Sequence, residues 1–127
     1  MGRPYVVHRL DRDTSWLLLF ARSAAARDKL QAGWSDVTNT YFAVVKGRPN
    51  ESEGRMENYL VEGSYFRVRI CGATDRGAKQ AISVYRVRHS SGPYTLVEVD
   101  LITGRKHQIR VHLNSLRCPI IGDAVYG

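Results

Sequence analysis

The chain has 127 residues, of which 43% are hydrophobic and 24% are charged, a composition typical of one folded globular domain. Its longest apolar run, residues 16–21, is far shorter than the roughly 20 residues that span a bilayer, and no signal-peptide pattern opens the chain. The formal net charge is +7, with 15 Arg and 4 Lys, and the arginine excess favours a nucleic-acid partner because guanidinium groups bind phosphate and stack on bases.

The first part of the chain contains one expected strand and one expected helix. Residues 15–21 (SWLLLFA) form an apolar run, which predicts a short buried strand. Ser23 is a preferred N-cap and Gly33 a helix stop, so a helix is predicted over residues 24–32. Residues 41–45 (YFAVV) are aromatic and β-branched and precede a Gly-Arg-Pro segment, which predicts a strand that ends there.

The middle of the chain predicts short strands and turns. Residues 51–54 are an expected loop, and residues 56–61 and 65–70 are expected strands around a turn at residues 62–64. The two cysteines, Cys71 and Cys118, form no CxxC pair. They predict a reducing, cytoplasmic location and neither a disulfide framework nor a zinc site.

The clearest pair of strands comes next, over residues 80–87 and 95–103, with a turn at residues 90–93. In the second strand, apolar and acidic residues alternate, which is typical of an antiparallel sheet with one face in water. A helix is predicted over residues 105–116 because apolar residues recur at helical spacing. The order of elements therefore predicts an α+β fold with a mixed, mostly antiparallel sheet and flanking helices.

A polar cluster, HRLDRDTS at residues 8–15, precedes the first apolar run. The Asp11 carboxylate lies between arginines, which favour its charged form, and such a carboxylate can act as a nucleophile or base. The alternative is a solvated turn whose surface ion pairs contribute little. The residues alone favour that alternative.

A second cluster, TGRKHQIRVH at residues 103–112, opens the predicted C-terminal helix. Its basic and amide side chains lie at the positive end of the helix dipole, which suits an anion, although an ordinary charged helix face would look the same. His107 and His112 are five residues apart and not four, which argues against a helical metal pair. The closing GDAVYG, residues 122–127, would by itself be a turn.

Together, these three segments resemble, in order and spacing, the motifs of the RluA-type family of RNA pseudouridine synthases, and NTYFAVVKG resembles the family's second motif. The resemblance implies a pseudouridine synthase fold with a basic active-site cleft, no cofactor and no metal. It also implies RNA, ribosomal or transfer, as the substrate, in which a uridine becomes pseudouridine.

The resemblance assigns roles to four residues. Asp11 matches the family's catalytic aspartate. A negative carboxylate suits the sugar C1′, because cleavage of the glycosidic bond builds oxocarbenium-like charge there. Tyr41 resembles the tyrosine that stacks on the target uracil, and Arg110 the arginine that pairs with the aspartate. Arg9 resembles the arginine that takes the place of the extruded base, since a stacked base cannot reach a pocket. His8, Arg105, His107 and Gln108 belong to the same motifs, and we expect structural or backbone-contact roles for them.

The chain also departs from the family pattern. Trp16 stands where a glycine is usual, and its ring is expected to need new room beside the catalytic loop. The family's preceding Asn-Lys-Pro-x-Gly strand and its following Leu-His-Ala segment are absent from residues 1–127. The sequence is therefore interpreted as the central part of one catalytic domain.

Two rival functions stay open. The first alternative is a non-catalytic RNA-binding module derived from a synthase, which Trp16 and the short ends favour and the set Asp11, Tyr41 and Arg110 opposes. The second is a general hydrolase built on Asp11 and a histidine, which no nucleophile–base spacing supports.

Overall fold

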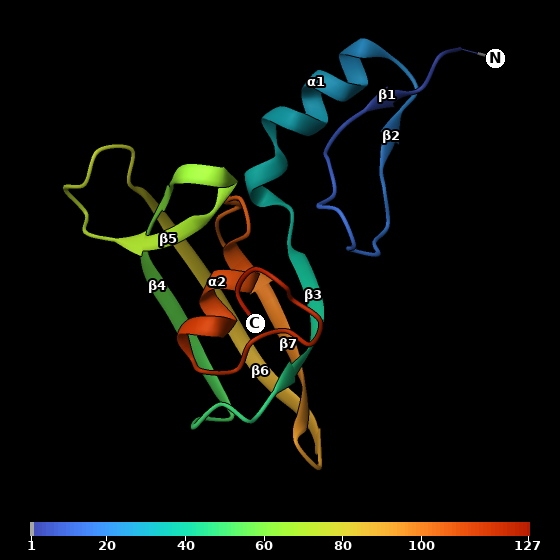
Figure 1. The fold of residues 1–127 in the computed structure, drawn as a ribbon. Coiled ribbons are helices and arrows are strands. Elements are labelled where there is room, and N and C mark those ends of the chain that lie inside the picture. Colours follow the sequence, from blue (N-terminus) through green and yellow to red (C-terminus); the bar gives the residue numbers. More distant parts are fainter. Residues whose placement is uncertain (1) are drawn as a thin grey trace. The chain divides into compact units, whose positions relative to one another are not determined.

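The computed structural model describes residues 2–127 and divides the chain into two compact units, residues 1–37 and 38–127. Figure 1 shows the elements of each unit. The first unit contains β1 (Tyr5–Val6), β2 (Phe20–Ala21), α1 (Ala24–Ala32) and the short turn η1 (Trp34–Asp36). The second contains β3 (Asn39–Lys46), β4 (Glu53–Glu62), η2 (Ser64–Phe66), β5 (Val68–Cys71), β6 (Lys79–Ser91), β7 (Tyr94–Leu101) and α2 (Gln108–Ser115).

In the first unit, the predicted helix is confirmed at both ends. The Ser23 hydroxyl accepts a hydrogen bond from the backbone N–H of Ala26 at 3.1 Å, and Gly33 closes the helix. The predicted buried strand over residues 15–21 is largely wrong, because only β2 is extended and Leu17 is 88% exposed. A two-residue strand pair leaves most of an apolar run without a surface to pack on.

The second unit is built around a five-stranded antiparallel sheet with the order β3-β7-β6-β4-β5. The strongest predicted pair, β6 and β7, lies at its centre and turns at Gly92 and Pro93. The expected loop at residues 51–54 is shorter, because β4 already begins at Glu53. The expected strand at residues 65–70 begins only at Val68, since the residues before it form η2.

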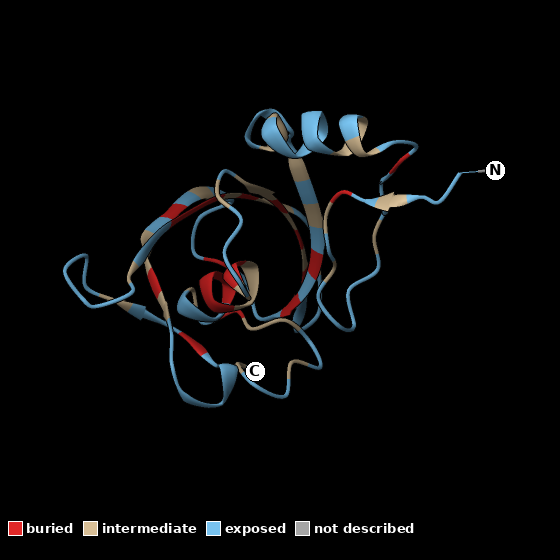
Figure 2. Ribbon diagram, turned by 90° about the horizontal axis from the view of Figure 1, so that it is seen from above, coloured by how far each residue is buried: buried red, intermediate tan, exposed pale blue. Residues whose placement is uncertain are grey.

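The core of this unit lies between the sheet and α2. Figure 2 shows the strands in an arc around α2, with buried residues on the strands and on the helix. Gly54 is required here, because a Cβ at that position would lie 2.8 Å from the buried Tyr85 ring. The main core cluster consists of Ala43, Val45, Met56, Tyr85, Val97, Val99, Leu113 and Cys118.

The C-terminal helix is shorter than the predicted residues 105–116. It begins at Gln108, because His107 has a left-handed backbone (φ 54°) and the residues before it form a turn. The mostly antiparallel α+β fold with two helices is confirmed. No helix within residues 2–127 is long and apolar enough to cross a membrane.

Candidate functional site

The Asp11 loop joins β1 to β2 in the first unit. The backbone N–H of Thr14 donates to the Asp11 carbonyl at 3.3 Å, and Asp13 takes a left-handed conformation (φ 67°), so the chain reverses tightly just after the predicted catalytic residue. Both Asp11 and Arg9 are exposed. The loop therefore presents the carboxylate to solvent on a short turn.

His8 holds this loop closed. Its Nε2 accepts a hydrogen bond from the backbone N–H of Leu19 at 3.1 Å, across the base of the loop. Its ring stacks on Trp34, with centroids 4.7 Å apart, and lies 6.4 Å from the tilted ring of Trp16. The expected structural role of His8 is thus supported, and the bulky Trp16 finds its room beside this imidazole.

Tyr41 and Arg110 lie in the second unit, on β3 and α2. Tyr41 is half-buried and pairs in register with Val99 of β7, on the same face of β3 as the buried Ala43 and Val45. Asp11 and Arg9 belong to the first unit. The roles of all four residues, and the pairing of Arg110 with Asp11, stay predictions.

Arg110 forms a bidentate ion pair with Asp123. Its Nε donates to one carboxylate oxygen at 2.8 Å and a terminal nitrogen to the other at 2.9 Å, the fork geometry that carboxylates favour. The backbone N–H groups of Val125 and Tyr126 also donate to Asp123, whose side chain is 4% exposed. The hydrogen bonds from Arg110 and from these two N–H groups hold the pKa of Asp123 well below its usual value.

Tyr126 completes this cluster. The Arg110 guanidinium lies 4.8 Å from the centroid of its ring, a cation–π contact. Its hydroxyl accepts a hydrogen bond from the backbone N–H of Val68 at 2.8 Å and meets His107 Nδ1 at 2.9 Å. The GDAVYG motif by itself predicts only a turn at these residues; in the structure, Asp123 and Tyr126 of this motif fix Arg110.

A buried hydrogen-bond network fixes the start of α2 on β6. The Gln108 side chain accepts from the Thr103 hydroxyl (2.8 Å) and from the Arg105 N–H (2.9 Å), and it donates to Ser83 (2.8 Å). His112 meets Ser83 at 2.9 Å through Nδ1. Four residues of the TGRKHQIRVH motif thus position the helix that carries Arg110.

The anion site expected at the start of this helix is not built as predicted. Gln108 is buried and fully used in the network just described. Lys106 forms an ion pair with Glu62, and Arg105 donates to the carbonyl of Gln80 at 2.8 Å. These side chains serve contacts within the protein, which agrees with the structural roles expected for Arg105, His107 and Gln108.

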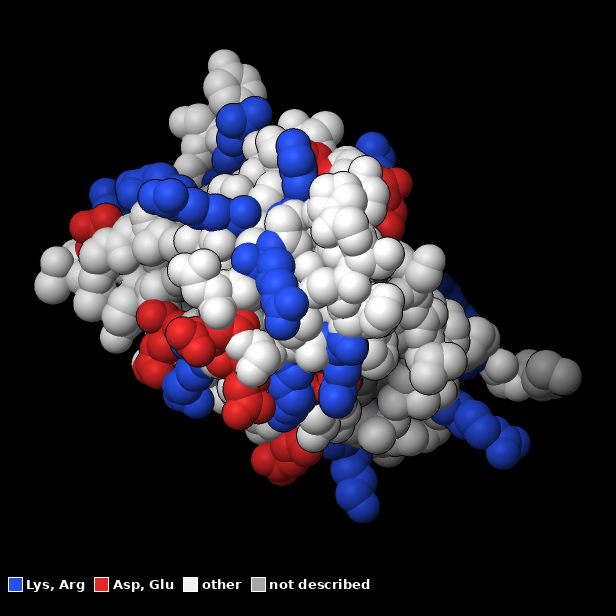
Figure 3. All heavy atoms as spheres, turned by 90° about the horizontal axis from the view of Figure 1, so that it is seen from below, with Lys and Arg blue, Asp and Glu red and all other residues white. Residues whose placement is uncertain are grey.

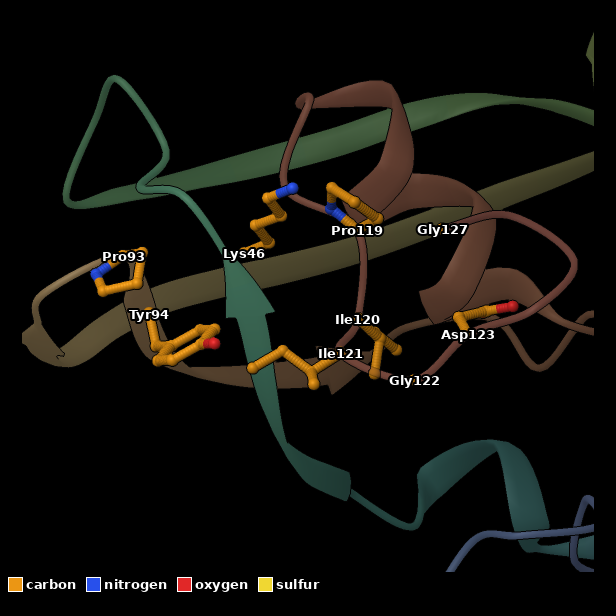
Figure 4. A pocket seen from close by; sticks show the side chains of 9 residues that line it. All are labelled: Lys46, Pro93, Tyr94, Pro119, Ile120, Ile121, Gly122, Asp123 and Gly127. Atoms are coloured by element: carbon orange, nitrogen blue, oxygen red, sulfur yellow. The ribbon is translucent and has the colours of Figure 1, made fainter.

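A shallow groove runs along the edge strand β3, where Ile121 donates its backbone N–H to the Val44 carbonyl at 2.9 Å. Figure 4 shows its lining, which includes Lys46 from β3, Tyr94 from the β6–β7 hairpin, and Ile121 and Asp123 from the segment after α2. Asp123 thus contributes both to the wall of the groove and to the Arg110 pair.

The charges suit a polyanion. Figure 3 shows Lys and Arg side chains spread over one face, with the largest group of Asp and Glu side chains at the lower left and smaller groups at the left and upper right. Within residues 2–127, the structure contains no group of three or more His, Cys, Asp or Glu side chains arranged to hold a metal ion.

The fold and the motif residues together define the class of protein, the RNA pseudouridylate synthase fold. The family model described as RNA pseudouridylate synthase matches residues 1–115. The chain belongs to this family.

Named relatives agree with this assignment. The chain is 39% identical to the ribosomal large subunit pseudouridine synthase D of Borreliella burgdorferi, over 98% of this chain and 39% of that protein. It is 38% identical to the ribosomal large subunit pseudouridine synthase C of Rickettsia bellii, over 96% of this chain and 42% of that protein. The solved structure of human RNA pseudouridylate synthase domain containing 4 superposes with a TM-score of 0.87 at 30% identity, covering 98% of this chain and 52% of that one. The chain thus spans about two-fifths of the length of these curated relatives.

Proposed function

We propose that this chain isomerises uridine to pseudouridine in structured RNA, ribosomal or transfer, with Asp11 as the essential carboxylate. The observation that carries the proposal is the family match over residues 1–115, within which the HRLD motif ends at a tight turn and Asp11 is exposed. The relatives named for the large ribosomal subunit favour ribosomal RNA as the first substrate to test. The free Cys71 and Cys118 are compatible with the reducing cytoplasm as the location.

The reaction conserves every atom of the uridine. The N1–C1′ bond breaks, the uracil turns, C5 bonds to C1′, the C5 proton leaves and N1 gains a proton. The negative Asp11 stabilises the positive charge that develops at C1′, and either adds to C1′ or removes a sugar proton. The detached uracil must stay bound away from water until it is reattached.

The other site residues have supporting roles in this proposal. Tyr41 stacks on the uracil and helps to move the C5 proton. Arg9 fills the place of the extruded base in the RNA. Arg110 orients Asp11, and its fixed position on α2, held by Asp123 and Tyr126, supports a positioning role.

The test is pseudouridine formation in unmodified ribosomal and transfer RNA transcripts, scored by nucleoside chromatography. Asp11→Asn is expected to abolish the product while RNA binding persists. Asp13→Asn is the matched control: it removes the same charge from the same exposed turn, and asparagine tolerates the left-handed backbone found there. Equal activity of the Asp11→Asn variant and the wild type would refute the proposed role. A folded wild type that binds RNA without forming product would favour the RNA-binding module.

A further inference from the structure

Two adjacent aromatic side chains, Tyr65 and Phe66, project into solvent from η2, between β4 and β5. Tyr65 is 93% exposed and Phe66 is 76% exposed. A folded chain normally covers rings of this size, because each ring carries a large apolar surface. An exposed aromatic pair therefore marks a surface that a partner is expected to cover.

The backbone that displays these rings is also unusual. Tyr65 has φ 56° and Phe66 has φ 58°, both in the left-handed region. Bulky residues disfavour this region, which turns normally fill with Gly or Asn. The turn is closed by Gly63, whose N–H donates to the Arg67 carbonyl at 2.7 Å. If this turn only connected β4 to β5, residues such as Gly or Asn would form it without strain. The two strained aromatic residues therefore indicate a function for their side chains.

Three cations border the pair, and two of them also form ion pairs with carboxylates. Lys106 lies 4.8 Å from the centroid of the Phe66 ring, and it also pairs with the Glu62 carboxylate. Arg67 follows directly and is exposed, and Arg69 lies on β5 with Asp75 at 4.0 Å. Aromatic rings bordered by cations are the combination that binds single-stranded nucleic acid, because the rings stack on bases and the cations meet phosphates.

The pair is connected to the candidate site within the same unit. Val68, two residues after Phe66, donates its backbone N–H to the Tyr126 hydroxyl at 2.8 Å, and Tyr126 lies under the Arg110 guanidinium. Lys106, which contacts Phe66, is next in sequence to His107, which also meets the Tyr126 hydroxyl. The aromatic pair therefore lies beside the residues that hold Arg110.

We propose that Tyr65 and Phe66 form a stacking platform for unpaired bases of the RNA substrate. The inference rests on the proposed function, since it names how this chain holds RNA beside the reacting uridine. The rings stack on the faces of bases and form no hydrogen bonds with base edges. We therefore expect the platform to prefer unpaired to paired nucleotides and to show no preference for a particular sequence.

The test is RNA affinity of the double variant Tyr65→Gly/Phe66→Gly in the complete chain. The probe is a fluorescein-labelled single-stranded 12-mer of uridylate, compared with its duplex with oligoadenylate. We expect about 10-fold weaker binding of the single strand and little change for the duplex. Glycine removes the left-handed strain, so the melting temperature should stay level or rise, and a misfolded variant cannot explain the loss. Phe42→Ala, which removes an exposed ring from β3, is the control and should bind within about two-fold of wild type.

Salt dependence separates stacking from phosphate contact. Loss of the two rings should leave the slope of log affinity against log salt concentration unchanged, whereas Arg67→Gln should reduce it by about 0.7, the value for one phosphate on a single strand. Single-strand affinity of the double glycine variant within two-fold of wild type would overturn the proposal and leave this surface to a partner other than RNA. A joint fall of affinity and melting temperature would also overturn it, because the rings would then be structural. Absence of pseudouridine synthesis in a wild type that shows the platform effect would count against the proposed function alone.

Discussion

His112 should make the stability of the fold pH-dependent below pH 6.5. The imidazole is fully buried, with Nε2 at 3.0 Å from the Asn58 side-chain oxygen and Nδ1 at 2.9 Å from the Ser83 hydroxyl. The Asn58 oxygen only accepts, so Nε2 carries the proton and Nδ1 accepts from Ser83. A second proton on Nδ1 would displace the Ser83 proton and bury a charge, and this burial lowers the pKa of His112 to about 4 from 6.5.

The direction of the effect follows from these two pKa values. The unfolded chain binds the His112 proton at higher pH than the folded chain, so stability is full above pH 6.5 and falls as the pH drops from 6.5 toward about 4. Between pH 7.5 and pH 5.5, linkage gives a loss of about 1.4 kcal/mol from this residue. The melting temperature should fall by several degrees for a chain of this size.

The assay is urea unfolding of the wild type and of His112→Gln at pH 7.5 and 5.5. Glutamine keeps one donor and one acceptor and does not titrate, and the contributions of the other three histidines cancel in the comparison. We expect the variant to be less stable at both pH values and to lose about 1.4 kcal/mol less than the wild type between them. An identical loss in both proteins would refute the assignment of a neutral buried His112.

Two further predictions concern the ion pair between Arg110 and Asp123 and the Ser23 cap of α1. Asp123→Asn should destabilise the chain by about 2 kcal/mol, because charged hydrogen bonds are lost. Since the pKa of Asp123 is lowered, its contribution is present above the unfolded value of 3.8 and is lost as the pH falls below it. Urea unfolding at pH 4.5 and 3 should therefore show a smaller acid loss in the variant, and an unchanged acid loss would contradict the pairing. Ser23→Ala should cost about 1 kcal/mol in urea unfolding, and Ser23→Asp should restore it, because either oxygen caps the Ala26 N–H; equal stability of all three proteins would exclude the cap.

Local signals in the sequence predicted the elements that depend on near neighbours. The helix of residues 24–32 was placed correctly because its cap and its stop, Ser23 and Gly33, act within four residues. The β6–β7 pair was found because alternating side chains and a Gly-Pro turn determine a hairpin locally. The motifs also named the family, and with it the candidate residues Asp11, Tyr41 and Arg110.

Local sequence signals could not predict which side chains are buried or which residues far apart in the sequence form hydrogen bonds. Residues 15–21 have the composition of a buried strand, yet Leu17 is exposed, because burial depends on the surface that other segments supply. The helix predicted from residue 105 begins at Gln108, since the side chain of that residue accepts a hydrogen bond from Thr103 and donates one to Ser83 inside the fold.

The sequence by itself determined the family, the class of fold and the list of chemical groups. Only the tertiary structure decided which group meets which: Arg110 with Asp123, Gln108 and His112 with Ser83, and Tyr65 and Phe66 with solvent. The physical reason is that these contacts depend on how segments far apart in sequence close on one another. Whether a carboxylate such as that of Asp123 is buried in an ion pair, or a ring such as that of Tyr65 is exposed to solvent, depends on which segments of the folded chain lie around it.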